Sequence, residues 1–237
     1  MSNVLYMEDS YLKEFEATVK SVKDDKFVVL DQTAFYPKSG GQPNDTGKLT
    51  TEDGTEYNVV FAGKFSGEIS HEVDKPGLKE GDKVKGTIDW DRRYRLMRMH
   101  TATHVLSSVF IKEAGALITG NQLDLEKTRI DFSLEDFDRD KISDYVKKAN
   151  ELSATNAEIK VSFMPREEVE QKPELARLAK GLPEGVKTLR IVNIEGIDIQ
   201  ADGGTHVKNT SEVGTIEVLD CKNKGKNNRR IYLTIKP

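Results

Sequence analysis

The chain has 237 residues, of which 36% are hydrophobic and 32% are charged, and its formal net charge is −4. This composition is typical of a globular protein with one large core or two smaller ones. It excludes a general attraction to nucleic acid, so any RNA contact needs a local basic patch. The single cysteine, Cys221, excludes an internal disulfide. The N-terminus lacks the basic start and apolar core of a signal peptide, and no apolar run approaches the roughly 18 residues of a membrane span, so we expect a cytoplasmic protein.

The first ninety residues predict a small β-barrel. Short runs alternate β-branched or aromatic residues with polar ones, and clusters of turn residues separate them. The runs cover residues 15–22, 26–36, 46–54, 55–65 and 82–90. Many short strands at this spacing are typical of a small closed barrel.

From residue 91 onward the pattern changes to helices alternating with strands. A helix is expected over residues 91–115, with Gly115 as its stop, and a charged helix over 135–156. Further elements are a short helix over 166–171 and strands over 129–134, 158–165, 188–200, 214–221 and 229–235, the last two forming a hairpin. No flexible linker occurs near residue 90. We therefore expect an α+β fold in which a barrel domain (1–90) packs on an α+β domain (91–237).

Two of the four histidines, His100 and His104, lie one helical turn apart in the first of these helices. This spacing puts both rings on one face, within reach of a single ion. An apolar stripe of Ala102, Leu106, Val109 and Phe110 occupies roughly the opposite side. The two rings are therefore poor candidates for the apolar core, and a solvated surface pair remains the alternative to a metal site.

Further ligands are available in the segment "ADGGTHVKNTSEVG", where Asp202 precedes His206 by four residues. Three imidazoles and a carboxylate could hold Zn²⁺, which polarises ester carbonyls and lowers the pKa of bound water. Position 101 is threonine rather than glutamate, which disfavours a zincin protease. Gly203 and Gly204 permit either a close backbone approach or an ordinary loop. His71 is left over, at the expected end of a strand.

Three stretches together resemble the alanyl-tRNA editing family. "TAFYPKSGGQPNDTG" resembles its glycine-rich motif, "RLMRMHTATHVLSSVF" its first metal motif and "ADGGTHVKNTSEVG" its second. The resemblance covers nearly the whole chain in order and is to the freestanding, medium-length form that carries the barrel. The threonyl-tRNA synthetase editing domain shares the histidine pair but not the barrel motif. The resemblance implies that His100, His104 and His206 bind zinc.

One departure concerns the fourth ligand. The family's second metal motif reads Cys-x-x-x-His, and Asp202 stands at the cysteine position. Asp202 is therefore expected to be a direct ligand, a partner that orients a histidine, or a sign of weaker zinc affinity. Cys221, fifteen residues beyond His206, is expected to be a buried small apolar residue rather than a substitute ligand.

The resemblance further implies an ATP-independent hydrolase that deacylates seryl-tRNA(Ala), and in some members glycyl-tRNA(Ala), while sparing alanyl-tRNA(Ala). A site that hydrogen-bonds the serine hydroxyl rejects alanine, because alanine would leave a buried polar group unpaired. Thr101, Thr103 and Thr119 are the candidates for this contact.

Other residues are candidates for binding the tRNA. Gly40, Gly41 and Gln42 of the glycine-rich stretch are expected either to face the substrate or to form a barrel turn, and Gly203 and Gly204 are further candidates. Basic contacts could come from Arg92 and Arg93, with Arg95 and Arg98, or from residues 222–230, although such runs are also common as solvated charge. We expect a monomer that needs no protein partner. A tRNA-binding relative without catalysis, and an unrelated metallohydrolase, remain the alternatives.

Overall fold

The computed structural model describes residues 3–135, 138–172, 175 and 185–237, and the chain forms two compact units. The first unit is Met1–Arg95 and the second is Leu96–Pro237. The division falls inside helix α1 (Trp90–Ala114), whose first residues belong to one unit and whose remainder belongs to the other. The expected mixed α+β fold is confirmed.

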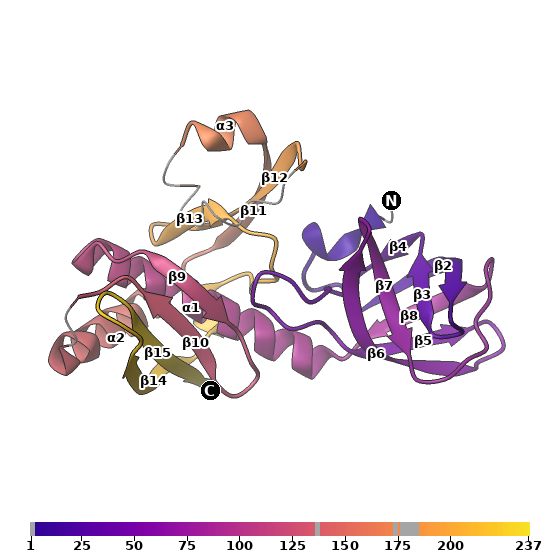
Figure 1. Cartoon of the computed structure of the whole chain (residues 1–237), viewed down its shortest axis with the longest axis horizontal. Helices are drawn as coiled ribbons and strands as arrows, with labels where there is room; N and C mark the ends of the chain where they lie inside the picture. The colour runs from indigo at the N-terminus through magenta and orange to yellow at the C-terminus, as the bar shows by residue number, and fades with distance from the viewer. Residues whose placement is uncertain (1–2, 136–137, 173–174, 176–184) are drawn as a thin grey trace. The chain divides into compact units, whose positions relative to one another are not determined.

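The first unit contains the expected barrel (Figure 1). Six antiparallel strands close in the order β2-β3-β7-β6-β5-β8. Their bounds are β2 (Glu14–Lys23), β3 (Phe27–Leu30), β5 (Gly47–Thr51), β6 (Glu56–Phe65), β7 (Glu68–Val73) and β8 (Lys83–Ile88). A short parallel pair of β1 (Asn3–Val4) and β4 (Gln32–Thr33) and a 3-10 turn, η1 (Leu5–Met7), accompany the barrel. Strand β7 was not among the predicted runs.

His71 lies in the middle of β7 and not at a strand end as expected. Its side chain is fully buried in the barrel. The ring nitrogen Nδ1 lies 2.9 Å from the carbonyl oxygen of Val28, and Nε2 lies 2.9 Å from Oγ1 of Thr33. Burial lowers the pKa of His71 to about 4, so the ring is neutral at physiological pH. His71 is therefore a satisfied core histidine.

The glycine-rich stretch forms a tight turn beside the barrel. Ser39 and Gln42 exchange two backbone hydrogen bonds, of 2.8 and 3.1 Å, and enclose Gly40 and Gly41. These glycines have φ values of 57° and 87°, a region that L side chains rarely adopt, and both are exposed. The side chain of Gln42 is buried. The backbone conformation of the turn is therefore sufficient to explain why glycine occupies both positions.

A buried ion pair stabilises the loop that continues from this turn. The guanidinium of Arg93 contacts the carboxylate of Asp45, and both side chains are fully buried. Arg93 also donates to the backbone carbonyls of Ser10 and Ala34, at 2.8 and 2.6 Å. Its neighbour Arg92 donates to the carbonyl of Asn44 at 3.0 Å. Arg93 therefore holds the loop from inside and does not offer RNA a surface charge, contrary to the expectation.

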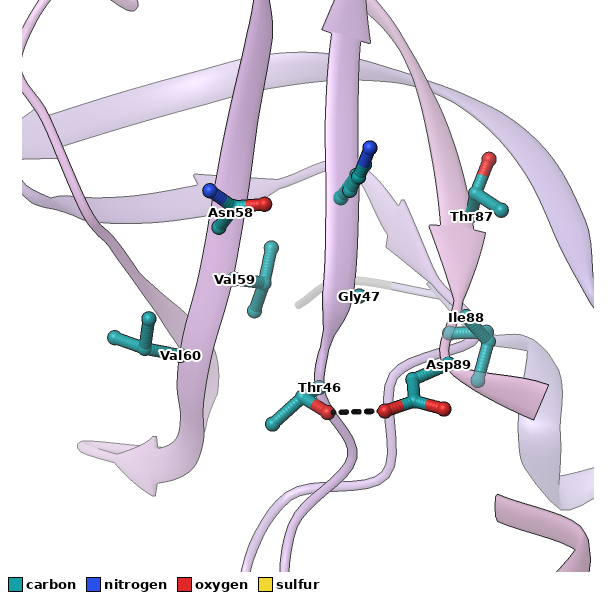
Figure 2. Close-up of a pocket in the computed structure, with 9 residues that line it drawn as sticks. Thr46, Gly47, Asn58, Val59, Val60, Thr87, Ile88 and Asp89 are labelled. Atoms are coloured by element: carbon teal, nitrogen blue, oxygen red, sulfur yellow. Dashed lines mark hydrogen bonds between the residues drawn. The ribbon is translucent and has the colours of Figure 1, made fainter. Parts of the chain in front are cut away.

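A groove of about 500 Å³ lies on the outside of the barrel, between β5, β6 and β8 (Figure 2). Figure 2 shows Thr46 and Asp89 beside each other at one end of the lining, joined by a hydrogen bond of 3.1 Å. Other polar side chains of the lining are also engaged, since Asn58 donates to Asp74 at 2.6 Å and Lys48 pairs with Glu56 at 2.8 Å. These polar side chains of the groove are therefore already bound to other protein groups and are poorly available to a ligand.

The second unit contains two antiparallel sheets. One has the order β14-β15-β10-β9 and the other β11-β12-β13. The first sheet consists of β9 (Ile118–Gln122), β10 (Thr128–Phe132), β14 (Thr215–Asn223) and β15 (Arg229–Lys236). The second consists of β11 (Ile159–Pro165), β12 (Thr188–Ile194) and β13 (Asp198–Ala201), and the remaining elements are α2 (Arg139–Ser153), α3 (Arg166–Glu170) and η3 (Thr210–Glu212). The predicted hairpin of the last two strands is confirmed.

One prediction for this unit was wrong in detail, and one strand was missed. Residues 188–200 form two strands rather than one, because the chain turns at Gly196, whose φ is 71°. Strand β9 was not predicted.

None of the described helices is long and apolar enough to cross a membrane.

Helix α1 is buried on all sides around the histidines. Every residue from Met99 to Phe110 is buried, and Phe110 stacks on Phe132 of β10 with ring centroids 4.5 Å apart. The side of the helix opposite the apolar stripe therefore faces other protein groups and not solvent. This excludes the alternative of a solvated surface pair for His100 and His104.

Candidate metal centre

Four potential metal ligands converge inside the second unit. Helix α1 supplies His100 and His104, and the loop that follows β13 supplies Asp202 and His206. One ligand atom from each residue lies within 4.8 Å of all the others. The three rings are at least nine-tenths buried, and the loop places His206 4.2 Å from His100, ring centroid to ring centroid. The sequence prediction that these four residues meet is confirmed.

The spacing of the ligand atoms fits a zinc ion. Oδ2 of Asp202 lies 3.4 Å from Nε2 of both His100 and His104, and these two nitrogens are 3.3 Å apart. Nε2 of His206 lies 3.6 Å from Oδ1 of Asp202. Four ligands held tetrahedrally about 2.0–2.1 Å from Zn²⁺ are about 3.4 Å from one another. The donor set and its spacing therefore suit zinc.

His104 is oriented by a carboxylate on its far nitrogen. Nδ1 of His104 lies 3.0 Å from Oδ2 of Asp198, and that oxygen also accepts a hydrogen bond from Nε2 of Gln200 at 2.7 Å. Asp198 and Gln200 are alternate residues of β13, and both are buried on the same face of the strand. When Nδ1 carries the proton and donates it to Asp198, the lone pair of Nε2 is directed at the cluster, which is the tautomer that a metal requires.

His206 is oriented by a hydroxyl. Its Nδ1 lies 3.1 Å from Oγ1 of Thr101, the residue next to His100 on α1. Its Nε2 is buried and has no hydrogen-bond partner among the described residues, although Asp202 lies beside it. A buried nitrogen without a donor is costly unless a cation engages its lone pair. The hydroxyl of Thr101 is thus engaged with a candidate metal ligand.

The loop of the second motif approaches the helix so closely that one position requires glycine. A Cβ atom at Gly204 would lie 2.2 Å from Cε1 of His100 and 2.9 Å from Oδ1 of Asp202, whereas a Cβ at Gly203 would meet nothing within 4 Å. Arg190 of β12 fixes the loop by donating to the carbonyls of Asp202 and Gly204, at 3.0 and 2.8 Å. Of the two glycines, only Gly204 is required by this packing.

The electrostatics of the cluster favour a bound cation. Burial raises the pKa of Asp202, but the charge of His100 and the close approach of all three histidine rings hold it well below its usual value. Burial and the charge of His100 hold the pKa of His206 well below its usual value. Burial also lowers the pKa of His104, yet hydrogen bonds to Asp198 and Asp202 outweigh this effect and raise it to about 9. Metal binding would therefore displace a proton that the carboxylates hold on His104.

The remaining candidates make other contacts in the structure. The hydroxyl of Thr103 is buried and donates to the carbonyl of Met99 at 2.8 Å, within its own helix. Thr119 lies on β9 with an exposed side chain, and its hydroxyl donates to Oδ1 of Asn228 at 3.1 Å. Cys221 lies on β14, only partly buried and outside the cluster. Gly40, Gly41, Gln42, Arg92 and Arg93 belong to the first unit.

Asp198, Gln200 and Arg190 support the centre and were missed by the sequence analysis. A signal was present, because Asp198 and Gln200 alternate with Ile197 and Ile199 just before the second motif. A strand with its polar side chains at alternate positions has one polar face. Nothing in the sequence showed that this face would be buried against His104.

Comparisons with known proteins agree with this arrangement. Residues 3–92 match the family of class II (A) tRNA synthetases, and residues 189–232 match the second additional domain of threonyl- and alanyl-tRNA synthetases. The chain is 58% identical to an alanyl-tRNA editing protein AlaX-M of Methanosarcina barkeri, with 99% of each chain covered. It is 47% identical to that of Saccharolobus solfataricus over the full length of both. It is also 40% identical to alanine–tRNA ligase of Pyrococcus abyssi, over 92% of this chain but 24% of the ligase. The chain therefore belongs to the family of AlaX-M alanyl-tRNA editing proteins.

Proposed function

We propose that this chain is a zinc-dependent aminoacyl-tRNA deacylase. Its substrate is seryl-tRNA(Ala), with glycyl-tRNA(Ala) as a second substrate, and alanyl-tRNA(Ala) is spared. The observation that carries the proposal is the buried His100–His104–Asp202–His206 cluster in a chain that is 58% identical to an AlaX-M editing protein. No ATP is needed, because the reaction is the hydrolysis of an activated ester.

Some residues of the cluster would bind the metal, and their neighbours orient the histidine rings. His100, His104 and His206 offer three ring nitrogens, and the carboxylate oxygens of Asp202 lie 3.4–3.6 Å from them. Asp198 and Thr101 fix two of the rings through their Nδ1 atoms. These residues would hold a zinc ion, which would supply Lewis acidity toward the ester carbonyl and lower the pKa of a bound water. The similar distances from Asp202 to all three rings favour a direct ligand over a purely orienting role.

Among the threonines, Thr119 is the best-supported candidate for reading the serine hydroxyl. Thr101 is engaged with His206, and Thr103 is engaged with its own helix. The side chain of Thr119 is exposed on β9, and its hydroxyl oxygen can still accept a hydrogen bond while donating to Asn228. Alanine lacks the hydroxyl that such a contact needs.

The glycine-rich turn is a candidate for contacting the substrate from the barrel. Its tip, Gly40 and Gly41, is exposed, and a Cβ atom at Gly40 would meet nothing within 4 Å. A glycine tip lets another molecule approach the backbone closely.

The test is a deacylation assay on seryl-, glycyl- and alanyl-tRNA(Ala), with metal analysis of the same protein. We expect about one zinc per chain, hydrolysis of seryl-tRNA, and no hydrolysis of alanyl-tRNA. Removal of zinc by a chelator, or the substitution His104→Ala, should abolish the activity. Tight tRNA binding without turnover by the zinc-loaded protein would instead identify a non-catalytic relative. Equal hydrolysis of simple esters and of all three tRNAs would identify an unrelated hydrolase.

A further inference from the structure

A group of cationic side chains surrounds Tyr232 on the outer face of the sheet β14-β15-β10-β9. Along β15, Ile231, Leu233 and Ile235 are buried, whereas Arg230 and Tyr232 are only partly so. Because side chains alternate between the two faces of a strand, Tyr232 lies on the face opposite the apolar core. We define the Tyr232 patch as Tyr232 with Lys127, Arg129, Lys222, Lys224 and Arg230.

The strand register brings these charges together from distant parts of the unit. Arg129 of β10 is the direct partner of Tyr232, and Lys222 of β14 is the direct partner of Arg230. The ammonium of Lys127 lies 4.9 Å from the Tyr232 ring centroid, and that of Lys222 lies 5.4 Å from it. Both distances are within the range of cation–π contacts. The Tyr232 ring is thus contacted by ammonium groups from the two segments that flank β15.

Positive charge exceeds negative charge in this patch. Arg230 is engaged with Asp131 through two contacts of 2.7 and 2.8 Å, Arg129 lies 4.0 Å from the same carboxylate, and Lys222 lies 3.4 Å from Asp220. Five cations therefore face these two carboxylates, in a chain whose formal net charge is −4. A hydrogen bond with Arg230, and then the charges of Arg230, Lys222 and Lys224, lower the pKa of the Tyr232 hydroxyl.

We propose that the Tyr232 patch binds the phosphate backbone of the RNA substrate. This inference rests on the proposed function. Lysine ammonium groups are compact charges that suit phosphates, and a patch of them attracts RNA without reading its sequence. An acidic protein would be attracted by the same charges, but protein interfaces usually centre on an apolar group of residues, and the patch has one tyrosine among five cations. RNA is therefore the better-matched partner.

A second contact links the patch to the proposed serine-reading residue. The hydroxyl of Thr119 donates to Asn228, in the loop that joins β14 to β15. Lys224 lies at the start of the same loop, and its backbone N–H donates to the carbonyl of Asn228 at 2.9 Å. An RNA held by the patch would therefore lie next to the loop that contacts Thr119.

The test measures binding of uncharged tRNA(Ala) by fluorescence anisotropy at several salt concentrations. The test variant is Lys127→Gln with Lys222→Gln, both exposed positions. The control is Lys26→Gln with Lys64→Gln, two exposed lysines of the barrel unit. The test variant should raise the Kd by about tenfold or more at low salt and reduce the slope of log K against log salt by about 2. The control pair should leave both quantities as in the wild type.

The two proposals fail in different ways. Because the binding assay uses uncharged tRNA, a wild-type protein that binds through the patch but does not hydrolyse seryl-tRNA would contradict only the proposed function. An unchanged Kd and salt slope in the test variant would overturn the patch, whatever the deacylation assay shows. The patch proposal would also be overturned if poly-glutamate displaced bound tRNA(Ala) more strongly than a non-cognate RNA did. That result would favour an acidic protein partner.

Discussion

Oδ2 of Asp198 lies 3.0 Å from Nδ1 of His104, while Nε2 of the same ring lies 3.3 Å from Nε2 of His100. The carboxylate and the candidate metal position are thus at the two nitrogens of one imidazole. This arrangement makes Asp198 a positioning residue for a metal ligand.

Replacing Asp198 should weaken zinc binding without removing a ligand. We expect Asp198→Ala to lower the zinc affinity by about 10–100-fold, because His104 loses the partner that fixes its tautomer. Asp198→Asn should have a smaller effect, since the amide oxygen can still accept from Nδ1. Competition with a chromogenic chelator measures the affinity, and NMR of the ring nitrogens reports the tautomer. Glu52→Gln, an exposed acid of the barrel unit, is the control. An unchanged affinity in Asp198→Ala would contradict the assigned role.

Asp202 can be tested by supplying the ligand that the family usually has. Asp202→Cys should keep or strengthen zinc binding, because a thiolate is a softer ligand than a carboxylate. Asp202→Ala should weaken it by more than the roughly 100-fold expected for an orienting residue. The measurement is zinc affinity with metal content after dialysis. A loss of about tenfold in Asp202→Ala would assign Asp202 an orienting role instead.

The two glycines of the second motif should respond differently to the same substitution. Gly204→Ala places a Cβ atom 2.2 Å from Cε1 of His100, so the ring or the loop must move and zinc affinity should fall at least tenfold. Gly203→Ala meets nothing within 4 Å and is the matched control. Zinc titration of the two variants makes the comparison. Equal affinities would show that the loop can shift without disturbing His100.

The buried pair of Asp45 and Arg93 should contribute far more to stability than an exposed pair. Asp45→Ala leaves the fully buried guanidinium of Arg93 without its carboxylate, which typically costs about 3–5 kcal/mol. Lys48→Gln breaks the exposed pair with Glu56 and should cost less than about 1 kcal/mol. Urea unfolding measures both. A small effect of Asp45→Ala would mean that the glycine-rich loop is held by other contacts.

The stability of the barrel should fall in mild acid because of His71. Its folded pKa is about 4, so between pH 6.5 and 4 the unfolded chain binds a proton that the folded chain does not. From pH 7 to pH 5 this should remove about 2 kcal/mol from the free energy of unfolding. His71→Gln should lack that part of the pH dependence.

Urea unfolding at several pH values makes the measurement on the wild type and on His71→Gln. NMR titration of the wild-type ring gives an independent check, since His71 should stay neutral at pH 5. A His71 pKa near 6.5 in the folded protein would contradict the prediction.

Local periodicity predicted much of this structure. The helix that carries His100 and His104 ends at Ala114, one residue before the expected stop at Gly115. The ligand set could also be predicted, because spacing and motif order are properties of the sequence. Burial could not be predicted, because the side of α1 opposite its apolar stripe carries polar residues, yet every residue from Met99 to Phe110 is buried in the fold. Asp198 was missed for the same reason, as it is 94 residues from its partner His104.

In the barrel, too, contacts between residues far apart in the sequence could not be predicted. The predicted runs found most of its strands, but the segment around His71 contains too few apolar residues to stand out. His71 looked unpartnered in the sequence, because its partners come from a neighbouring strand and from Thr33, which lies 38 residues away. Arg93 looked like a surface charge because its carboxylate, Asp45, is 48 residues distant.

The ligands of the candidate metal centre come from the beginning of the second unit and from a loop much later in its sequence. An ion bound there would act as a cross-link that closes a chain segment of almost a hundred residues between His104 and Asp202. Such closure reduces the freedom of the unfolded chain, and binding to the folded form alone adds stability with increasing metal concentration. The second unit should therefore resist proteolysis better when loaded than when stripped, with the barrel much less affected. Zinc supply would then set the lifetime of the protein as well as its activity.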